Sequence, residues 1–194
     1  MTRLRPGRAW CAVAALLALG SALAWGRPNA AIDWQPGLWP GEPWRAFSAV
    51  FVHYSALHLL GNAAGLALVA ALGAAARVPG RVALAWLAAW PLTQIGLLWQ
   101  PALAYYGGLS GVVHAGVAIV CVHLLCTGHR WLGGPVLAML VAKVLSESPW
   151  ASPLRYPQGW DIAIAPLGHA TGLVAGTVCA LIGEALARAG RVRS

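Results

Sequence analysis

Residues 82–129, VALAWLAAWPLTQIGLLWQPALAYYGGLSGVVHAGVAIVCVHLLCTGH, decide the fold, because these 48 residues include no Asp, Glu, Lys or Arg. As one helix rising about 1.5 Å per residue, the stretch would be more than twice as long as a bilayer core of about 30 Å. It must therefore fold back on itself. We predict the break at residues 100–108, since Pro101 opposes helix continuation and Gly107-Gly108 favours a turn.

The rest of the chain has the same apolar character. Residues 46–76 and 162–183 also lack charged side chains, and the chain is 59% hydrophobic and 9% charged, against roughly 25% charged in a soluble domain. This composition excludes a soluble fold and predicts an all-α polytopic membrane protein with one domain over residues 1–194. We expect six transmembrane helices, at about residues 9–25, 54–76, 82–99, 110–128, 131–147 and 167–187.

The basic residues predict the orientation of these spans. The formal charge is +8, but the basic side chains stand singly at the edges of apolar segments, which argues against nucleic-acid binding and for a role in topology. Three arginines fall on one side of the six-span layout: Arg27, Arg45 and Arg155. Nine fall on the other: Arg3, Arg5, Arg8, Arg77, Arg81, Arg130, Arg188, Arg191 and Arg193. Both termini are therefore expected in the cytoplasm, with the functional site near the opposite face.

Two features of these spans have alternative interpretations. The first span could be a cleaved signal peptide, because a basic start, an apolar run and Ala22-Leu23-Ala24 fit that pattern, although cleavage would remove one wall of a small bundle. Lys143 is the one formal charge deep in a span, where it either pairs with Glu147 one turn later, extends outward, or acts as a functional intramembrane lysine. The four cysteines lie in apolar stretches without metal-binding spacing, so we expect neither a disulfide nor a cysteine site.

A few polar side chains within the apolar helices are candidates for function, because buried polar groups are costly in lipid. They are His53, His58, Asn62, Ser110, His114 and His169. His58 and Asn62 are four residues apart and share one helical face. Ser110 lies in GGLSG, and His169 precedes Gly172 and Gly176, which form a small-xxx-small ridge. The glycines would let two helices approach closely enough for a hydrogen bond between Ser110 and His169.

This set predicts acyl-transfer chemistry. Ser110 would be the nucleophile and His169 its general base, with the side chains of His58 and Asn62 and the backbone N–H of Ser110 facing a developing oxyanion. No acidic residue lies in a span near His169, so we expect a dyad. His114, one turn after Ser110, is expected to pack against or orient His169.

The sequence resembles the rhomboid intramembrane serine proteases in motifs that follow in order along the chain. The motifs are Trp44-Arg45, FVHYSALHLLGN over residues 51–62, Gly108-Leu109-Ser110-Gly111, and His169 with Gly172 and Gly176. The resemblance implies a six-helix rhomboid-like bundle with a water-accessible cavity, Ser110 and His169 as the catalytic pair, and His58 and Asn62 in the oxyanion hole. It also implies supporting roles for His53, Trp44, Arg45 and the motif glycines, and no cofactor.

One departure points to a branch of that family. His114 stands where the family commonly has a tyrosine. This histidine and the small six-span layout make the chain similar to rhombosortase, a bacterial branch associated with proteins that carry a Gly-Gly-containing C-terminal membrane anchor. This similarity implies a bacterial inner-membrane protein, open to the periplasmic face, whose partners are membrane lipid and membrane-anchored exported substrates.

Other classes of membrane protein fit the sequence less well. A zinc protease would need a motif such as HExxH, which residues 53–58 lack, and an aspartyl protease would need two Asp in spans. A haem or metal protein with paired histidines, including His123, stays open, as does a non-proteolytic rhomboid-like chaperone, although such proteins typically lack the serine or the histidine. We expect His123 to be a buried packing residue and His129 to lie at the cytoplasmic edge.

Overall fold

A computed structural model describes residues 6–192, and no β-strand occurs in that range. Six long helices correspond to the six predicted apolar segments: α1 Arg8–Ala24, α3 Ala56–Ala75, α4 Gly80–Ile95, α5 Ser110–Cys126, α6 Arg130–Ser146 and α7 Pro166–Val192. A short helix, α2 Arg45–Ser48, lies in the first loop. The prediction of an all-α fold is confirmed.

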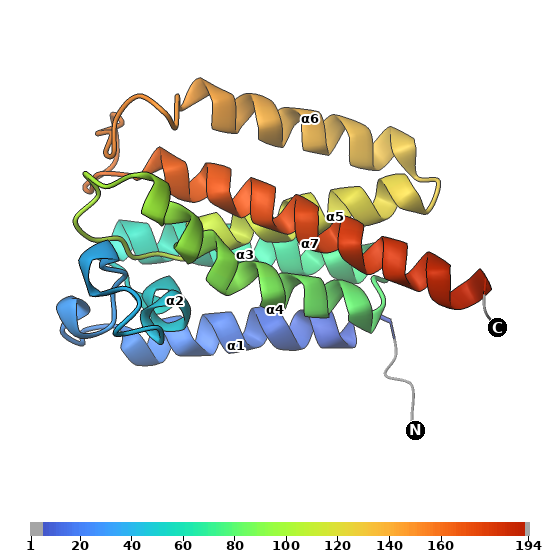
Figure 1. Cartoon of the computed structure of the whole chain (residues 1–194), viewed down its shortest axis with the longest axis horizontal. Helices are drawn as coiled ribbons and strands as arrows, with labels where there is room; N and C mark the ends of the chain where they lie inside the picture. The colour runs from blue at the N-terminus through green and yellow to red at the C-terminus, as the bar shows by residue number, and fades with distance from the viewer. Residues whose placement is uncertain (1–5, 193–194) are drawn as a thin grey trace.

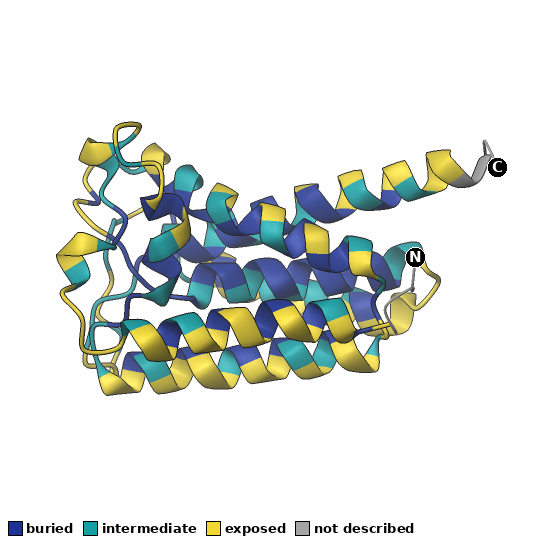
Figure 2. Cartoon of the chain, turned by 90° about the horizontal axis from the view of Figure 1, so that it is seen from below, coloured by how far each residue is buried: buried dark blue, intermediate teal, exposed yellow. Residues whose placement is uncertain are grey.

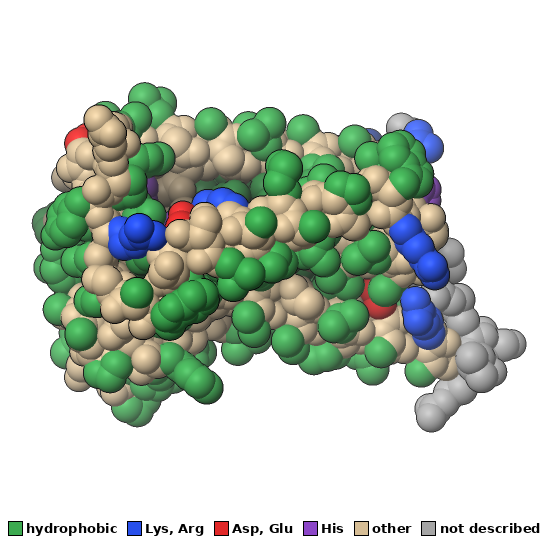
Figure 3. Space-filling model, turned by 90° about the horizontal axis from the view of Figure 1, so that it is seen from above, with side chains coloured by type: hydrophobic (Ala, Val, Ile, Leu, Met, Phe, Trp, Pro, Cys, Tyr) green, Lys and Arg blue, Asp and Glu red, His purple; other side chains and the backbone are tan. Residues whose placement is uncertain are grey.

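The long helices run alternately up and down, so the bundle has two ends (Figure 1). The start of α1 and the end of α7 lie at one end, called here the terminus end, and the long connections before α3, before α5 and before α7 lie at the other, the loop end. Basic side chains gather at the terminus end, which carries Arg8, Arg77, Arg81, Arg130 and Arg188 (Figure 3). Of the other arginines in the predicted asymmetry, Arg3, Arg5 and Arg193 lie outside the described residues.

The core is built on α5. Its buried residues include Val112, Ala115 and Ile119, and Figure 2 shows buried positions concentrated in the middle of the bundle. Trp10 of α1 and Trp86 of α4 stack beside it with their ring centroids 4.2 Å apart. Small residues on α5 let neighbouring helices approach closely, which increases the dispersion contacts between them. Within lipid these contacts matter because water supplies no hydrophobic driving force for helix association.

The outer surface of the helices is apolar, as expected of an integral membrane protein. Leu68, Leu84 and Met139 are among the large hydrophobic side chains that the bundle leaves exposed. Within residues 6–192, three helical segments are long and apolar enough to cross a membrane: Ala56–Ala75, Gly80–Trp99 and Pro166–Gly190. α1, α5 and α6 have 17 residues each, or about 25 Å at 1.5 Å per residue. The predicted count of six spans therefore stays a prediction.

The helix ends and connections have local causes. The Ser55 hydroxyl accepts a hydrogen bond from the backbone N–H of His58 (3.0 Å) and so caps the start of α3. Gly128 has a φ of 92° in the turn between α5 and α6, a left-handed conformation that glycine adopts at little cost. These features fix where the helices carrying the candidate site begin and end.

Two backbone bridges organise the loop end. Trp34 and Tyr106 exchange backbone hydrogen bonds of 2.7 and 2.8 Å, which join the first loop to the segment that leads into α5. Arg155 and Ile164 do the same at 2.9 and 2.8 Å, which folds the segment between α6 and α7 back on itself. All four cysteines are free thiols.

Candidate active site

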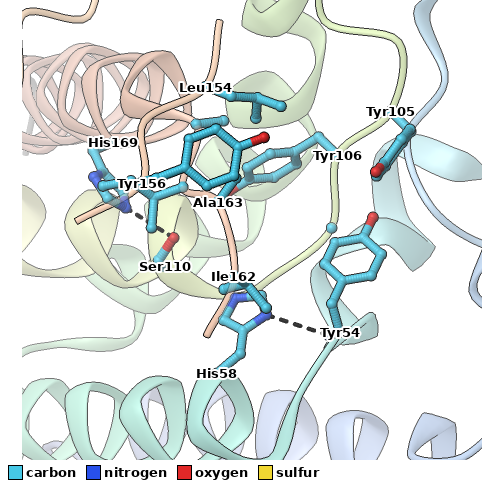
Figure 4. A pocket seen from close by; sticks show the side chains of 13 residues that line it. Tyr54, His58, Tyr105, Tyr106, Ser110, Leu154, Tyr156, Ile162, Ala163 and His169 are labelled. Atoms are coloured by element: carbon cyan, nitrogen blue, oxygen red, sulfur yellow. Dashed lines mark hydrogen bonds between the residues drawn. The ribbon is translucent and has the colours of Figure 1, made fainter. Parts of the chain in front are cut away.

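Ser110 and His169 meet at the loop end of the bundle. Ser110 is the first residue of α5 and His169 lies in the first turn of α7. The Ser110 hydroxyl and Nε2 of His169 are 3.0 Å apart, and both residues line the same cavity (Figure 4). A hydroxyl held against an imidazole nitrogen at this distance can pass its proton to that nitrogen as the oxygen attacks an electrophile.

The close approach of α5 and α7 depends on glycine. A Cβ at Gly172 would lie 2.0 Å from the carbonyl oxygen of Gly111, and one at Gly111 would lie 2.6 Å from the carbonyl oxygen of Gly168. A Cβ at Gly176 would lie 2.4 Å from the carbonyl oxygen of Ala115. Backbone therefore packs on backbone along this interface, and the short serine side chain can reach the histidine of the facing helix.

His58 and Asn62 of α3 project toward the same region. The backbone N–H of Tyr54 donates to Nδ1 of His58 (3.4 Å), so the neutral ring carries its hydrogen on Nε2. A Cβ at Gly108, whose φ is 129°, would lie 2.7 Å from that Nε2 and 3.6 Å from Nδ2 of Asn62. Nδ2 of Asn62 is buried and has no hydrogen-bond partner within the described residues. Two donors thus converge on the backbone beside Ser110.

His114 lies against the other face of the His169 ring. The two imidazoles stack with centroids 4.2 Å apart and an interplanar angle of 11°. Nδ1–H of His114 donates to the backbone carbonyl of Ser110 (2.7 Å), since a carbonyl oxygen can only accept. The histidine at this position thus packs on the ring and is anchored to the start of α5.

The expectation that no acid lies near His169 is wrong. Glu147, the residue that follows α6, has Oε2 2.6 Å from Nδ1 of His169. Lys143 pairs with Glu147 (3.0 Å), one of the alternatives left open by the sequence, and its Nζ also lies 3.0 Å from Nδ1 of His169 and 2.7 Å from Nε2 of His114. The i, i+4 spacing of Lys143 and Glu147 showed that they share a face, but it could not show that this face turns toward α7.

Other predicted supporting residues organise the first loop instead of the cavity. The Arg45 guanidinium is buried and donates from Nη1 to the backbone oxygens of Asp33 (2.7 Å) and Ala30 (3.1 Å) and to Oδ1 of Asp33 (3.2 Å). Burial raises the pKa of the Asp33 carboxyl, which Arg45 and Gln35 partly offset. Trp44 is half-exposed and does not line the cavity.

His53 lies outside the catalytic group. It precedes α3, is buried, and its ring centroid lies 5.0 Å from that of His58. Nδ1–H of His53 donates to the backbone oxygen of Phe51 (3.1 Å), and burial lowers the pKa of its imidazole. The neutral ring therefore packs against His58 and limits how that side chain can turn.

The cavity has a volume of about 300 Å³ and opens beside Ser110. Its floor is formed by His58, Ser110 and His169, and its walls come from Tyr54 and Tyr105 and from the segment between α6 and α7, including Tyr156 and residues 162–165. Figure 4 shows Tyr156 and Ile162 among the side chains that line the cavity with Ser110. The wall residues are mostly apolar or aromatic, so the cavity suits an extended peptide with small side chains better than a charged ligand.

Comparison with known proteins identifies the family. The model of the Rhomboid domain matches residues 40–185, well over half of the chain. A comparison with curated protein sequences gives no match. The matched region includes all of the residues that meet around the cavity, from His58 on α3 to His169 on α7. The chain therefore belongs to the rhomboid family, a family of intramembrane serine proteases.

Proposed function

We propose that this protein is an intramembrane serine endopeptidase in which Ser110 is the nucleophile and His169 the general base. The observation that carries the proposal is the 3.0 Å contact between the Ser110 hydroxyl and Nε2 of His169, at the floor of a cavity open to the surface. Both groups come from helices packed glycine to glycine, which holds this geometry without a bound ligand.

The reaction follows from the positions of the donors. The Ser110 oxygen attacks the scissile carbonyl carbon while its proton passes to Nε2 of His169. The carbonyl oxygen becomes negative and accepts hydrogen bonds from Nε2–H of His58, from Nδ2 of Asn62 and from the backbone N–H of Ser110, which is free as the first amide of α5. His169 then gives the proton to the leaving amine, and water hydrolyses the acyl-enzyme.

Labelling by a fluorophosphonate probe tests this chemistry directly. Wild-type protein in detergent should be labelled, and Ser110→Ala should not be, because the probe forms its bond with an activated serine oxygen. Labelling of Ser110→Ala equal to wild type would contradict the proposal. A non-proteolytic rhomboid-like chaperone would instead bind membrane proteins without being labelled and without cutting them.

The proposed topology has six spans, with both termini in the cytoplasm and the cavity facing the periplasm of a bacterial inner membrane. The support is the concentration of basic side chains at the terminus end. Tags at either terminus should be accessible from the cytoplasm alone, and a tag between Pro28 and Gly37 from outside. An externally accessible C-terminus would contradict this arrangement.

The proposed substrates are exported proteins with a C-terminal membrane anchor preceded by small, Gly-rich residues, as in the rhombosortase branch. A helix hides its carbonyls in backbone hydrogen bonds, so the cut segment must unwind, and glycine lowers that cost and fits a narrow cavity. A reporter with such an anchor should be released by the wild type and retained by Ser110→Ala. Equal release after replacing the small residues by Leu or Val would contradict the assignment to this branch and leave the protease assignment intact.

A further inference from the structure

Two side chains from α6 compete for one nitrogen of His169. Oε2 of Glu147 lies 2.6 Å from Nδ1, and Nζ of Lys143 lies 3.0 Å from the same atom. An ionised carboxylate can only accept a hydrogen bond and an ammonium group can only donate one. Nδ1 can therefore satisfy one of these partners at a time, according to whether it carries a hydrogen.

The choice between the partners sets the reactivity of Ser110. When Nδ1–H donates to Glu147, Nε2 has a free lone pair facing the Ser110 hydroxyl and can take its proton. When Lys143 donates to Nδ1, the hydrogen of the neutral ring must be on Nε2, which then cannot act as the base. One hydrogen-bond partner thus favours the active tautomer and the other favours the inactive one.

Lys143 has other acceptors in the same cluster. Its Nζ lies 3.0 Å from Oε1 of Glu147 and 2.7 Å from Nε2 of His114, whose Nδ1–H is committed to the backbone of Ser110. The Lys143 side chain is 43% exposed, whereas that of Glu147 is 15% exposed. Glu147 can therefore hold Lys143 with one oxygen and His169 with the other, so the lysine is satisfied without the imidazole.

We propose that Glu147 is a positioning residue that completes a Ser110–His169–Glu147 arrangement, by keeping the hydrogen of His169 on Nδ1 and directing Lys143 away from the ring. The inference rests on the proposed serine-protease function. In the attack step the proton moves from Ser110 to Nε2, and Glu147 stays ionised and stabilises the resulting imidazolium. The same proton then leaves with the amine product, so Glu147 neither gains nor loses a proton.

The other titratable groups around His169, among the described residues, come from several elements. His114 stacks on the ring from α5, and His58 lines the same cavity from α3. Four tyrosines also line that cavity: Tyr54, Tyr105, Tyr106 and Tyr156. All of these groups are present in every variant below, so differences between the variants report on Lys143 and Glu147. Lys143 and Glu147 carry opposite charges beside one imidazole, so replacing each by a neutral residue should shift the pH profile of labelling in opposite directions.

The experiment measures the rate of fluorophosphonate labelling of the full-length protein in detergent as a function of pH. Glu147→Gln should slow labelling by about 10²-fold to 10⁴-fold, because its amide can donate to Nδ1 and favour the inactive tautomer. The acid limb of the profile, where protonation of His169 stops the reaction, should move to lower pH, since the imidazolium has lost its negative neighbour. Glu147→Asp should recover part of the rate.

Lys143→Met provides the second variant and does not depend on the stability of Glu147→Gln. Removing the positive charge should move the acid limb to higher pH, opposite to the shift in Glu147→Gln. The double variant Lys143→Met, Glu147→Gln should label faster than Glu147→Gln alone, because Lys143, one of the two donors that favour the inactive tautomer, is gone. A carboxylate with a purely structural role would produce neither the opposite shifts nor this recovery.

Glu184→Gln is the matched control, because Glu184 also accepts a hydrogen bond from a histidine, at the other end of the bundle. It should keep the labelling rate and pH profile of the wild type. Wild-type rate and profile in Glu147→Gln, or an unshifted profile in Lys143→Met, would overturn the inference while the serine-protease function stands. Labelling of Ser110→Ala would overturn the function itself, so the two failures are distinguishable.

Discussion

The two ends of the bundle hold the same pair of side chains in different surroundings. At the loop end, Nδ1 of His169 lies 2.6 Å from Glu147. At the terminus end, Nδ1 of His123 lies 2.7 Å from Glu184, and Nη2 of Arg81 contacts both carboxylate oxygens of Glu184 at 3.1 and 3.2 Å. A buried histidine paired with a carboxylate therefore occurs twice, on helices that contact each other along the bundle.

What differs is the surroundings of each imidazole. Nε2 of His169 lies 3.0 Å from the Ser110 hydroxyl, and its ring lines a cavity of about 300 Å³ together with His58. The ring of His123 also lines a cavity, of about 590 Å³, but among the described residues no hydroxyl is hydrogen-bonded to that ring. A histidine–carboxylate pair beside a cavity is therefore not enough to make the proposed site. The loop end differs in having a hydroxyl against the imidazole, the proposed nucleophile, with the side chains of His58 and Asn62 nearby as the proposed oxyanion donors.

The largest expected effect separates the two histidines. Ser110→Ala and His169→Ala should each lower peptide cleavage by about 10⁴-fold or more, because nucleophile and base act as a unit. His123→Ala, the matched control, should lower the melting temperature and leave the rate per folded molecule unchanged. Cleavage assays with thermal unfolding in detergent check this. An equal loss of cleavage in His123→Ala would contradict the expectation that only the histidine at the loop end takes part in cleavage.

The next effect concerns the donors that the loop end has and the terminus end lacks. His58→Ala and Asn62→Ala should each reduce cleavage by about 10²-fold to 10³-fold, as expected for one lost oxyanion donor where others remain. The loss should appear in kcat more than in KM, because the hydrogen bonds strengthen in the transition state. A change confined to KM would assign these side chains to substrate binding.

A smaller effect tests whether the tight helix contact creates the functional end. Gly172→Ala would place a Cβ 2.0 Å from the Gly111 oxygen, so α5 and α7 must separate and the contact between Ser110 and His169 must lengthen. A displacement of about 1 Å should cost about 10²-fold in rate. Gly183→Ala on the same helix has open space and is the control, with activity near wild type. Similar activity in the two variants would show that the contact is not required.

The smallest expected effect on activity is at the terminus end. Glu184→Gln removes the charge that Arg81 and His123 share, and it should lower the free energy of unfolding by about 2 kcal/mol, in the range for hydrogen bonds to charged groups. The rate per folded molecule should not change, because the carboxylate lies at the opposite end from Ser110. Unfolding monitored by circular dichroism in detergent checks the first part, and labelling checks the second.

Much of the architecture was predictable because it depends on local patterns. The six apolar segments became helices whose ends lie within a few residues of the predicted bounds, since apolar runs, Pro, Gly and charge act over one or two turns. Gly111, Gly172 and Gly176 predicted the α5–α7 contact, because small residues on one helical face let a neighbouring backbone approach closely.

The parts that sequence did not predict depend on how distant segments pack. Glu147 was considered only as a partner for Lys143, and His123 was expected to be a packing residue, yet each carboxylate–histidine pair joins residues far apart in the chain. α6 buries few of its residues among the described part, so its apolar pattern does not specify which face turns inward.

By itself, the sequence determined that this chain is a helical membrane protein that carries Ser110, His169 and the His58–Asn62 pair on three separate helices. Composition and short-range periodicity carry that information, because the cost of burying charge in lipid and the spacing along a helix act locally. Only the tertiary structure decided that Glu147 and Lys143 flank Nδ1 of His169, while no hydroxyl of the described residues is hydrogen-bonded to the ring of His123. Those distances depend on the rotation of each helix and the course of the loops, which are set by packing over the whole bundle.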